Sequence, residues 1–251
     1  MSNLAQGLRA PLLALAGILL LIVLPWWLAV SGGIRPVILP SLSAVYNSMI
    51  EMIADGTLAR HTWTSLVRVN VGFALAIVTA IPLGILLGSM PRLNRAFEPM
   101  IESFRFVIPF SWIPLVVLWF GTSEAGKYFL IWYAGFFILV LPTIEAVKTV
   151  DPDYVKAART LGAGRGVIFF KVLLPAILLE LVTALRVAFA MCWIALLSAE
   201  LVASRGGLGY LILDAREVLE TDVVIVGMIV IGVIGALYNW VFRLIERRFH
   251  F

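Results

Sequence analysis

The chain has 251 residues, of which 62% are hydrophobic and only 14% charged, with a formal net charge of +4. Soluble domains are roughly half apolar and a quarter charged, so this composition indicates one domain that lies mostly in lipid. There is no basic cluster with interleaved aromatic residues to bind nucleic acid. A single cysteine, Cys192, and two isolated histidines, His61 and His250, exclude an intrachain disulfide and a zinc enzyme.

Six stretches are long and apolar enough to cross about 30 Å of hydrocarbon as helices. They cover residues 12–30, 67–88, 101–120, 128–147, 176–203 and 222–242. The third is the weakest, since Glu102 and Arg105 lie at its start and Pro109 and Pro114 interrupt it. Irregular backbone is not tolerated against lipid, so this segment should face protein or a water-filled path. The sequence therefore predicts an all-α bundle of six transmembrane helices.

The Lys and Arg residues between these stretches set the expected orientation. With both termini in the cytoplasm, the inner segments hold twelve of them and the outer segments six. This bias favours cytoplasmic termini. The stretch 12–30 can also be read as a cleaved signal peptide, although it has little charge before it and is long for that purpose.

Residues 41–56, between the first two stretches, have a helical pattern of their own. Ser41 can cap the start and Gly56 can end the helix. The apolar positions at helical spacing are Leu42, Val45, Tyr46, Met49, Ile50 and Ile53. We expect an amphipathic helix on the outer face that packs against the bundle.

The longest inner loop, residues 148–175, is the most informative part of the sequence. Asp151-Pro-Asp153 supplies a helix start, with carboxylates at the positive end of the helix dipole. About two helical turns follow, from Tyr154 to Leu161, and Gly162, Gly164 and Gly166 then interrupt them. A second amphipathic turn covers 167–174 before Pro175 opens the next span. Such a bent pair of short helices is either a docking surface or a plain solvated loop.

The run Lys156-Ala-Ala-Arg-Thr-Leu-Gly162 with Leu174-Pro175 resembles the EAA loop of permeases in ATP-binding-cassette importers. The resemblance covers nearly the whole chain and is strongest to the nitrate, sulfonate and taurine branch. Asp214-Ala-Arg-Glu217 with Thr221-Asp222 is similar to its alkanesulfonate and taurine members. The other segments that resemble this branch, in the same order, are Leu39-Pro-Ser41, Ser65-Leu-Val-Arg68 with Gly72, Ile113-Pro-Leu115, Leu118-Trp-Phe-Gly121, Leu185-Arg186, Ala199-Glu200 and Gly206-Gly-Leu-Gly-Tyr210.

The resemblance implies a type I importer permease in a bacterial inner membrane that acts as a homodimer. It implies two ATPase subunits inside, which use ATP and magnesium, and one substrate-binding protein outside. This chain would bind no cofactor and catalyse no covalent chemistry. The implied solute is a small anion, with alkanesulfonate or taurine favoured and nitrate or bicarbonate possible. The inner loop would form the coupling helix to the ATPase, through Tyr154, Lys156, Ala157, Ala158, Arg159, Leu161 and Gly162.

One position departs from the family pattern. The glutamate that usually begins the EAA motif corresponds to Lys156, which replaces a hydrogen-bond acceptor with a donor. The partner groove would then be more acidic than usual.

Two glycine patterns invite functional interpretations. Residues 121–127 match the first seven places of a phosphate-binding loop, but Tyr128 stands where a Ser or Thr would hold magnesium, so we expect only a tight turn. Gly84 and Gly88 form a GxxxG pair near Pro82, which predicts close helix packing and leaves a hinge as the alternative.

Ionisable residues inside spans are costly and usually face the bundle interior. Arg186, near mid-membrane, either binds an anion through its bidentate fork or has a structural partner, which is Glu180 or a group on another helix. Glu145 and Glu200 are candidate gate or packing groups. The full set of predicted path residues is Ser111, Trp112, Arg186, Trp193, Ser198 and Glu200.

Three other functions compete with an anion importer. An importer of a non-anionic nutrient would share every motif above. A secondary transporter would show inverted repeats with paired broken helices, and only one strongly broken span is visible. An intramembrane enzyme would need a Ser/His, paired Asp or HExxH set, and neither histidine lies inside a predicted span.

Overall fold

The computed structural model describes residues 38–249, and the regular structure of that part of the chain is helical. The first predicted span, 12–30, lies outside the described residues. A short 3₁₀ turn (Pro109–Trp112) precedes α5, and a π-helical turn (Phe169–Leu173) precedes α9. The α-helices are α2 (Leu42–Ala54), α3 (Thr57–Ser89), α4 (Pro91–Arg105), α5 (Ile113–Phe120), α6 (Glu124–Thr149), α7 (Pro152–Thr160), α8 (Arg165–Ile168), α9 (Leu174–Ala203), α10 (Leu208–Glu217) and α11 (Thr221–Phe249).

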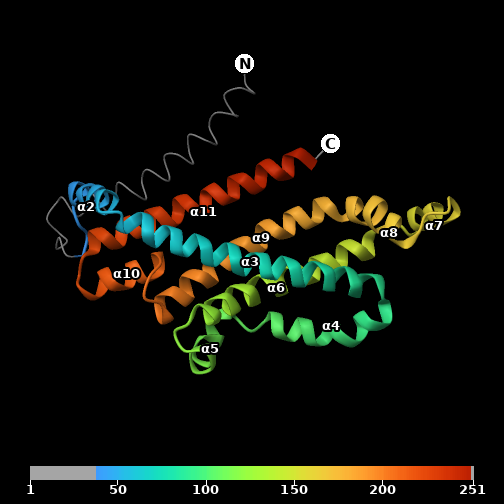
Figure 1. Ribbon diagram of the computed structural model, residues 1–251, viewed down its shortest axis with the longest axis horizontal. Coiled ribbons are helices and arrows are strands. Elements are labelled where there is room, and N and C mark those ends of the chain that lie inside the picture. The colour runs from blue at the N-terminus through green and yellow to red at the C-terminus, as the bar shows by residue number, and fades with distance from the viewer. Residues whose placement is uncertain (1–37, 250–251) are drawn as a thin grey trace, which may run out of the picture.

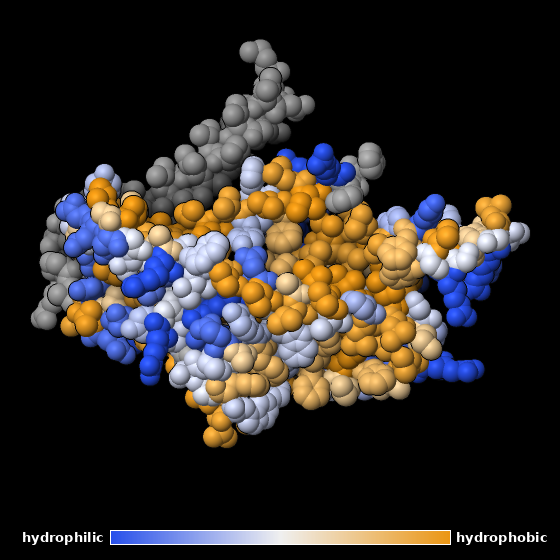
Figure 2. All heavy atoms as spheres, in the orientation of Figure 1, coloured by the Kyte–Doolittle hydropathy of each residue, from blue (hydrophilic) through white to orange (hydrophobic). Residues whose placement is uncertain are grey.

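The long helices α3, α6, α9 and α11 run side by side along the molecule (Figure 1). Four helical segments of the described part are long and apolar enough to cross a membrane: Thr57–Ser89, Glu124–Thr149, Arg165–Val202 and Thr221–Arg248. Figure 2 shows apolar side chains gathered over the middle of the visible face and hydrophilic ones toward its two ends. This is the pattern of a membrane-spanning bundle.

The segment predicted as the weakest span is indeed broken. α4 and the stretch Pro109–Phe120 meet at an angle of 84°, and only together do they pass as one candidate span. Pro109 has no N–H for a continuing helix, and a proline also disfavours helical backbone at the residue before it. The described residues thus supply four spans, or five if the bent pair crosses as one.

α3 and α6 pack closely because glycines of α3 leave room for side chains of α6. A Cβ on Gly84 would lie 2.6 Å from the Cβ of Thr143, and one on Gly88 would lie 2.7 Å from that of Val147. Real atoms do not approach so closely, so a side chain at either glycine would push the helices apart. The close packing predicted from the GxxxG pair is confirmed.

α2 forms as predicted. The Oγ of Ser41 accepts a hydrogen bond from the N–H of Ala44, and Gly56, just after the helix, adopts the left-handed backbone that favours glycine. Val45 and Met52 are buried against the bundle. The other part of the apolar stripe is exposed within the described structure: Leu42, Tyr46, Ile50 and Ile53.

The molecule has two distinct ends (Figure 1). The helices α2 and α10 lie at one end, which we call the α2 end. The helices α7 and α8 project from the opposite end, which we call the α7 end. Gly164 therefore lies at the end opposite to Asp55 and Glu217, as the six-span arrangement requires.

Candidate functional site

The segment between α6 and α9 is a short helix closed at both ends by local chemistry. The carboxylate of Asp151 accepts a hydrogen bond from the N–H of Asp153 at 2.9 Å, and Pro152 occupies the first turn. Gly162 ends α7 with a left-handed φ of 80°, and the N–H of Ala163 donates to the carbonyl of Ala158 at 3.0 Å. This is the glycine-dependent C-terminal turn that the sequence predicts.

The second turn of this loop is not separate from the next span. α8, the π-helical turn and α9 follow one another without a break, so a helical run extends from Arg165 to Val202. Pro175 lies in the first turn of α9 and has no N–H for the carbonyl of Lys171. The widened π-helical turn accommodates that missing hydrogen bond.

The surface of α7 has an unusual mixture of exposed groups. Leu161 is 88% exposed and Tyr154 is 65% exposed, while Ala157 and Ala158 leave a shallow face beside them. Large exposed apolar residues around small ones are typical of a protein interaction site. The Nζ of Lys156 lies 2.7 Å from Asp153 of the same helix, and Arg159 is exposed and makes no ion pair with the described residues.

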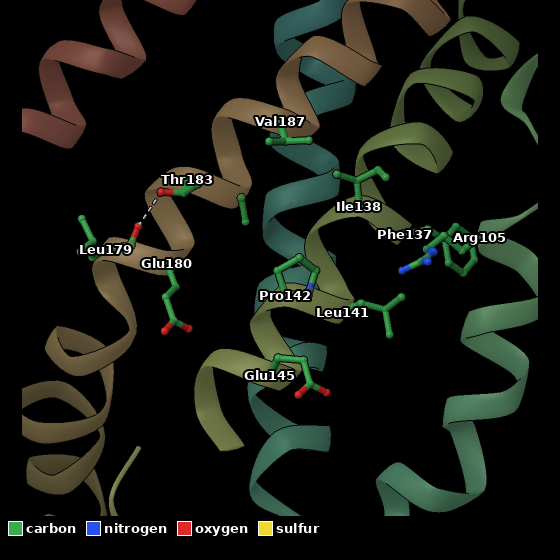
Figure 3. A pocket seen from close by; sticks show the side chains of 11 residues that line it. Arg105, Phe137, Ile138, Leu141, Pro142, Glu145, Leu179, Glu180, Thr183 and Val187 are labelled. Carbon is green, nitrogen blue, oxygen red and sulfur yellow. Dashed lines mark hydrogen bonds between the residues drawn. The ribbon is translucent and has the colours of Figure 1, made fainter. Parts of the chain in front are cut away.

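A cavity of about 690 Å³ lies between α4, α6 and α9 (Figure 3). Most of its lining residues come from the second half of α6 and the first half of α9, which lie nearer the α7 end. Much of its wall is apolar, with Ile138, Leu141 and Pro142 supplied by α6. Its charged groups are one arginine, Arg105, and two glutamates, Glu145 and Glu180, which come from three different helices. The cavity can admit a small solute, but its carboxylates outnumber its cations.

Arg186 has a partner on α11. Its Nη1 donates to Glu246 at 2.8 Å, and the other carboxylate oxygen of Glu246 accepts from the hydroxyl of Thr183 at 3.0 Å. Glu180, the alternative considered from the sequence, makes no ion pair with it. Glu246 lies beyond the end of the predicted span 222–242, in the last turn of α11, so a search for charged residues inside spans does not find it.

The predicted path residues do not form one surface. Arg186 and Trp193 share a second cavity of about 240 Å³ between α9 and α11. Ser111 is exposed, and Trp112 packs against the ring of Tyr133 with centroids 5.4 Å apart. The hydroxyl of Ser198 donates to its own helix at Ile194.

Glu200 belongs to a buried ionic cluster at the α2 end. Its side chain is completely buried and accepts hydrogen bonds from Arg68 at 2.9 Å, from Ser65 at 2.8 Å and from the N–H of Gly209 at 3.0 Å. Arg68 also forms a two-pronged contact with Glu124, through Nε at 2.7 Å and Nη2 at 2.6 Å. One guanidinium therefore joins α3 to both α6 and α9.

The segment 204–209 folds around this cluster. Arg68 donates to the carbonyl of Gly206, and the N–H of Gly207 donates to the Nδ1 of His61 at 3.0 Å. A Cβ at Gly207, whose φ is 110°, would collide with the carboxylate of Glu200. Several segments that carry the sequence resemblance thus meet in one place, although they lie up to 143 residues apart. The sequence signal for this cluster is the presence of charged residues inside the predicted spans. The sequence does not show which of these residues pair with one another.

Comparison with known proteins agrees with this architecture. A family model described as "Binding-protein-dependent transport system inner membrane component" matches residues 80–251. The taurine transport system permease protein of Escherichia coli is 35% identical over 92% of this chain and 86% of its own length. An aliphatic sulfonates transport permease protein of the same organism, described as putative, is 34% identical over 90% of this chain and 86% of its own length.

Two further matches widen the comparison. The bicarbonate transport system permease protein of Synechocystis is 30% identical over 91% of this chain and 84% of its own length. A chain of an inward-facing MetNI methionine ABC transporter superposes with a TM-score of 0.66 at 21% identity, over 78% of this chain and 97% of that chain. The likeness to the MetNI chain shows the fold of this protein. The chain belongs to the family of inner-membrane components of binding-protein-dependent transport systems, and it has the all-α fold of a type I ABC importer permease.

Proposed function

We propose that this chain is the permease subunit of an ATP-driven importer that carries a small anionic solute inward, with a sulfonate favoured. Two copies would pair in a bacterial inner membrane, with both termini in the cytoplasm. Each would dock an ATPase subunit, and the pair would receive the solute from an extracytoplasmic binding protein. The relatives named for taurine, aliphatic sulfonates and bicarbonate support an anionic solute.

The exposed α7 helix is the observation that carries this proposal. It projects beyond the bundle at the α7 end (Figure 1). Tyr154, Leu161 and Ala157 are exposed there, and Ala158 is half-buried beside them. An ATPase groove would bury these apolar side chains at roughly 25 cal/mol per Å² of surface removed from water. In a family of importer components, such a surface suits a subunit that does not hydrolyse ATP itself.

The connection between α7 and α9 suggests how hydrolysis would drive transport. α7 is joined to α8 through residues 161–164, and α9 continues from α8 through the π-helical turn. A displacement of α7 that moves α8 would therefore pass along one helical run to Glu180 and Thr183 in the cavity wall. ATP-driven closure of the ATPases would push the two α7 helices together and turn the path from inward-open to outward-open. ATP and magnesium would remain on the ATPase, and this chain would supply only movement and a path.

Arg186 has two possible roles in this path: it holds α9 to α11 through Glu246, which is the structural form, or it binds the solute, which is the anion-binding form. Its contact with Glu246, whose side chain is only 18% exposed, supports the structural form. A guanidinium already paired with a carboxylate has less attraction for a passing anion. The anion-binding form requires that the solute displace Glu246.

Reconstitution separates this function from its alternatives. We expect the chain in vesicles to transport a labelled sulfonate only when the ATPase, ATP and the binding protein are all present. Transport by the chain alone, driven by an ion gradient, would identify a secondary transporter. ATP-dependent uptake of a neutral or cationic nutrient, with no uptake of any anion, would keep the importer and reject the anionic solute.

A further inference from the structure

A second polar cavity, of about 520 Å³, opens at the α2 end beside the ionic cluster. Its wall comes from α3, from the turn before α6, from the first turn of α6 and from the segment that follows α9. Four cations line it: Arg60, Arg68, Lys127 and Arg205. Among the described lining residues, Glu124 supplies the one carboxylate. This composition is the reverse of the cavity near the α7 end, where two glutamates face one arginine.

The positive charge of this cavity is only partly balanced. Glu124 is shared between Arg68 at 2.6 Å and Lys127 at 2.8 Å, and Glu200 lies behind Arg68 at 2.9 Å. Four cations thus meet two carboxylates even when Glu200 is ionised. Charges held in a cleft with low-dielectric walls attract an opposite charge more strongly than charges on an open surface.

The cations also have hydrogen-bond donors to spare. The ammonium of Lys127 has three N–H groups, and one of them donates to Glu124. Its side chain is only 4% exposed and lines the cavity, so little water competes with a ligand for the ammonium. Arg60 and Arg205 are exposed and form no ion pair within residues 38–249. Each offers a planar fork that matches the oxygens of a sulfonate, phosphate or carboxylate.

We propose that this cavity binds one oxyanion group, with Lys127 below it and Arg60 and Arg205 at its rim. The favoured ligand is the sulfonate of a small free solute, and its use in import rests on the proposed function. A cavity of this size at the end opposite to α7 would collect the anion before it enters the path. The cavity near the α7 end, with its excess of carboxylates, cannot supply this selectivity.

The test measures binding of methanesulfonate to the purified full chain in detergent without lipid. Dimethyl sulfone, which has nearly the same size and no charge, is the matched probe. Arg205→Gln removes a rim cation that has no ion-pair partner among the described residues, so the fold should be unaffected. Arg216→Gln removes the same charge from the exposed face of α10 at the same end, outside the cavity, and is the matched control.

We expect saturable binding of methanesulfonate, no binding of dimethyl sulfone, and at least a tenfold weaker affinity in Arg205→Gln than in Arg216→Gln. Equal effects of the two variants, or equal binding of the two probes, would overturn the proposal. Weaker methanesulfonate binding in nanodiscs that contain phosphatidylglycerol would show that a lipid phosphate competes for the same oxyanion site. If methanesulfonate does not bind but Arg205→Gln weakens capture of the binding protein, the cavity receives a protein carboxylate and the proposal is wrong.

This outcome can be separated from that of the proposed function. Absence of methanesulfonate binding in a chain that still supports ATP-driven uptake would reject the site and leave the importer intact. Binding without any ATP-driven uptake would keep the site and reject the importer.

Discussion

The two ends of the molecule use charge in opposite ways. At the α2 end, Arg68 and Glu200 are buried, and their hydrogen bonds stay within the chain. At the α7 end, Lys156 and Asp153 are about three-quarters exposed, and Arg159 makes no ion pair in the described structure. A buried ion pair defines one arrangement of helices, because either partner alone is very costly in a low-dielectric interior. An exposed ion pair contributes little to the arrangement of the helices, and its surface stays free to bind another protein.

The largest expected effect is at the buried end. Arg68→Met leaves Glu124 and Glu200 without their shared guanidinium, and breaking a buried pair typically costs about 3–5 kcal/mol. We expect a large fall in the thermal stability of the purified chain, with loss of protein from the membrane. Arg92→Met, which removes an exposed cation next to the start of α4, is the control. Equal stability of the two variants would mean that the cluster does not hold the bundle together.

The next prediction concerns the exposed end and should leave stability unchanged. Ala158→Glu places a large charged side chain on the face where we propose that the ATPase approaches closely. Co-purification of the ATPase should fall at least tenfold, which corresponds to about 1.4 kcal/mol of binding energy. Ala54→Glu, at an exposed alanine of the α2 end, should bind the ATPase as the parent does. Normal ATPase binding and transport by Ala158→Glu would show that α7 is not the docking site.

A half-buried pair lies between these extremes. The side chain of Arg186 is 31% exposed, and loss of its contact leaves Glu246 with only the hydroxyl of Thr183 as a partner, which costs about 1–3 kcal/mol for a hydrogen-bonded group. If the pair is structural, Arg186→Leu should lower stability, and the double variant with Glu246→Leu should recover part of it. An Arg186→Leu variant that keeps the stability of the parent but transports no solute would instead place Arg186 on the anion path. Thermal unfolding and vesicle uptake separate the two results.

The smallest effect on folding is expected at Lys156. Its contact with Asp153 is an exposed pair three residues apart on one helix, so Lys156→Glu should change stability by less than about 0.5 kcal/mol. The informative measurement is ATPase affinity. Weaker binding would support an acidic partner groove, and stronger binding would show that the groove has kept the cationic character that the family's usual glutamate suits.

The local chemistry of the sequence was sufficient to predict the individual helices and their ends. Apolar length predicted membrane-spanning helices, Ser41 and Gly56 marked the ends of α2, and Pro109 marked a break. Each of these signals acts within a few residues, through a cap, a missing N–H or a glycine backbone. α3 begins at Thr57, well before the predicted span at 67, because the helix continues beyond the apolar stretch through polar residues, among them the exposed Arg60 and the buried His61. Apolar length alone does not show that Arg68 has two carboxylate partners, Glu124 and Glu200.

The pairing of charged groups was decided by tertiary structure. Arg186 meets Glu246, 60 residues away, and not Glu180 on its own helix. Arg68 meets Glu200 across 132 residues and Glu124 across 56. Such contacts depend on how α3, α6, α9 and α11 are rotated and shifted against one another, which the small residues at their interfaces control. The sequence by itself determined that this is a membrane bundle with an exposed loop helix; only the packing of the helices decided which charges are neutralised inside the chain and which stay free for a ligand or partner.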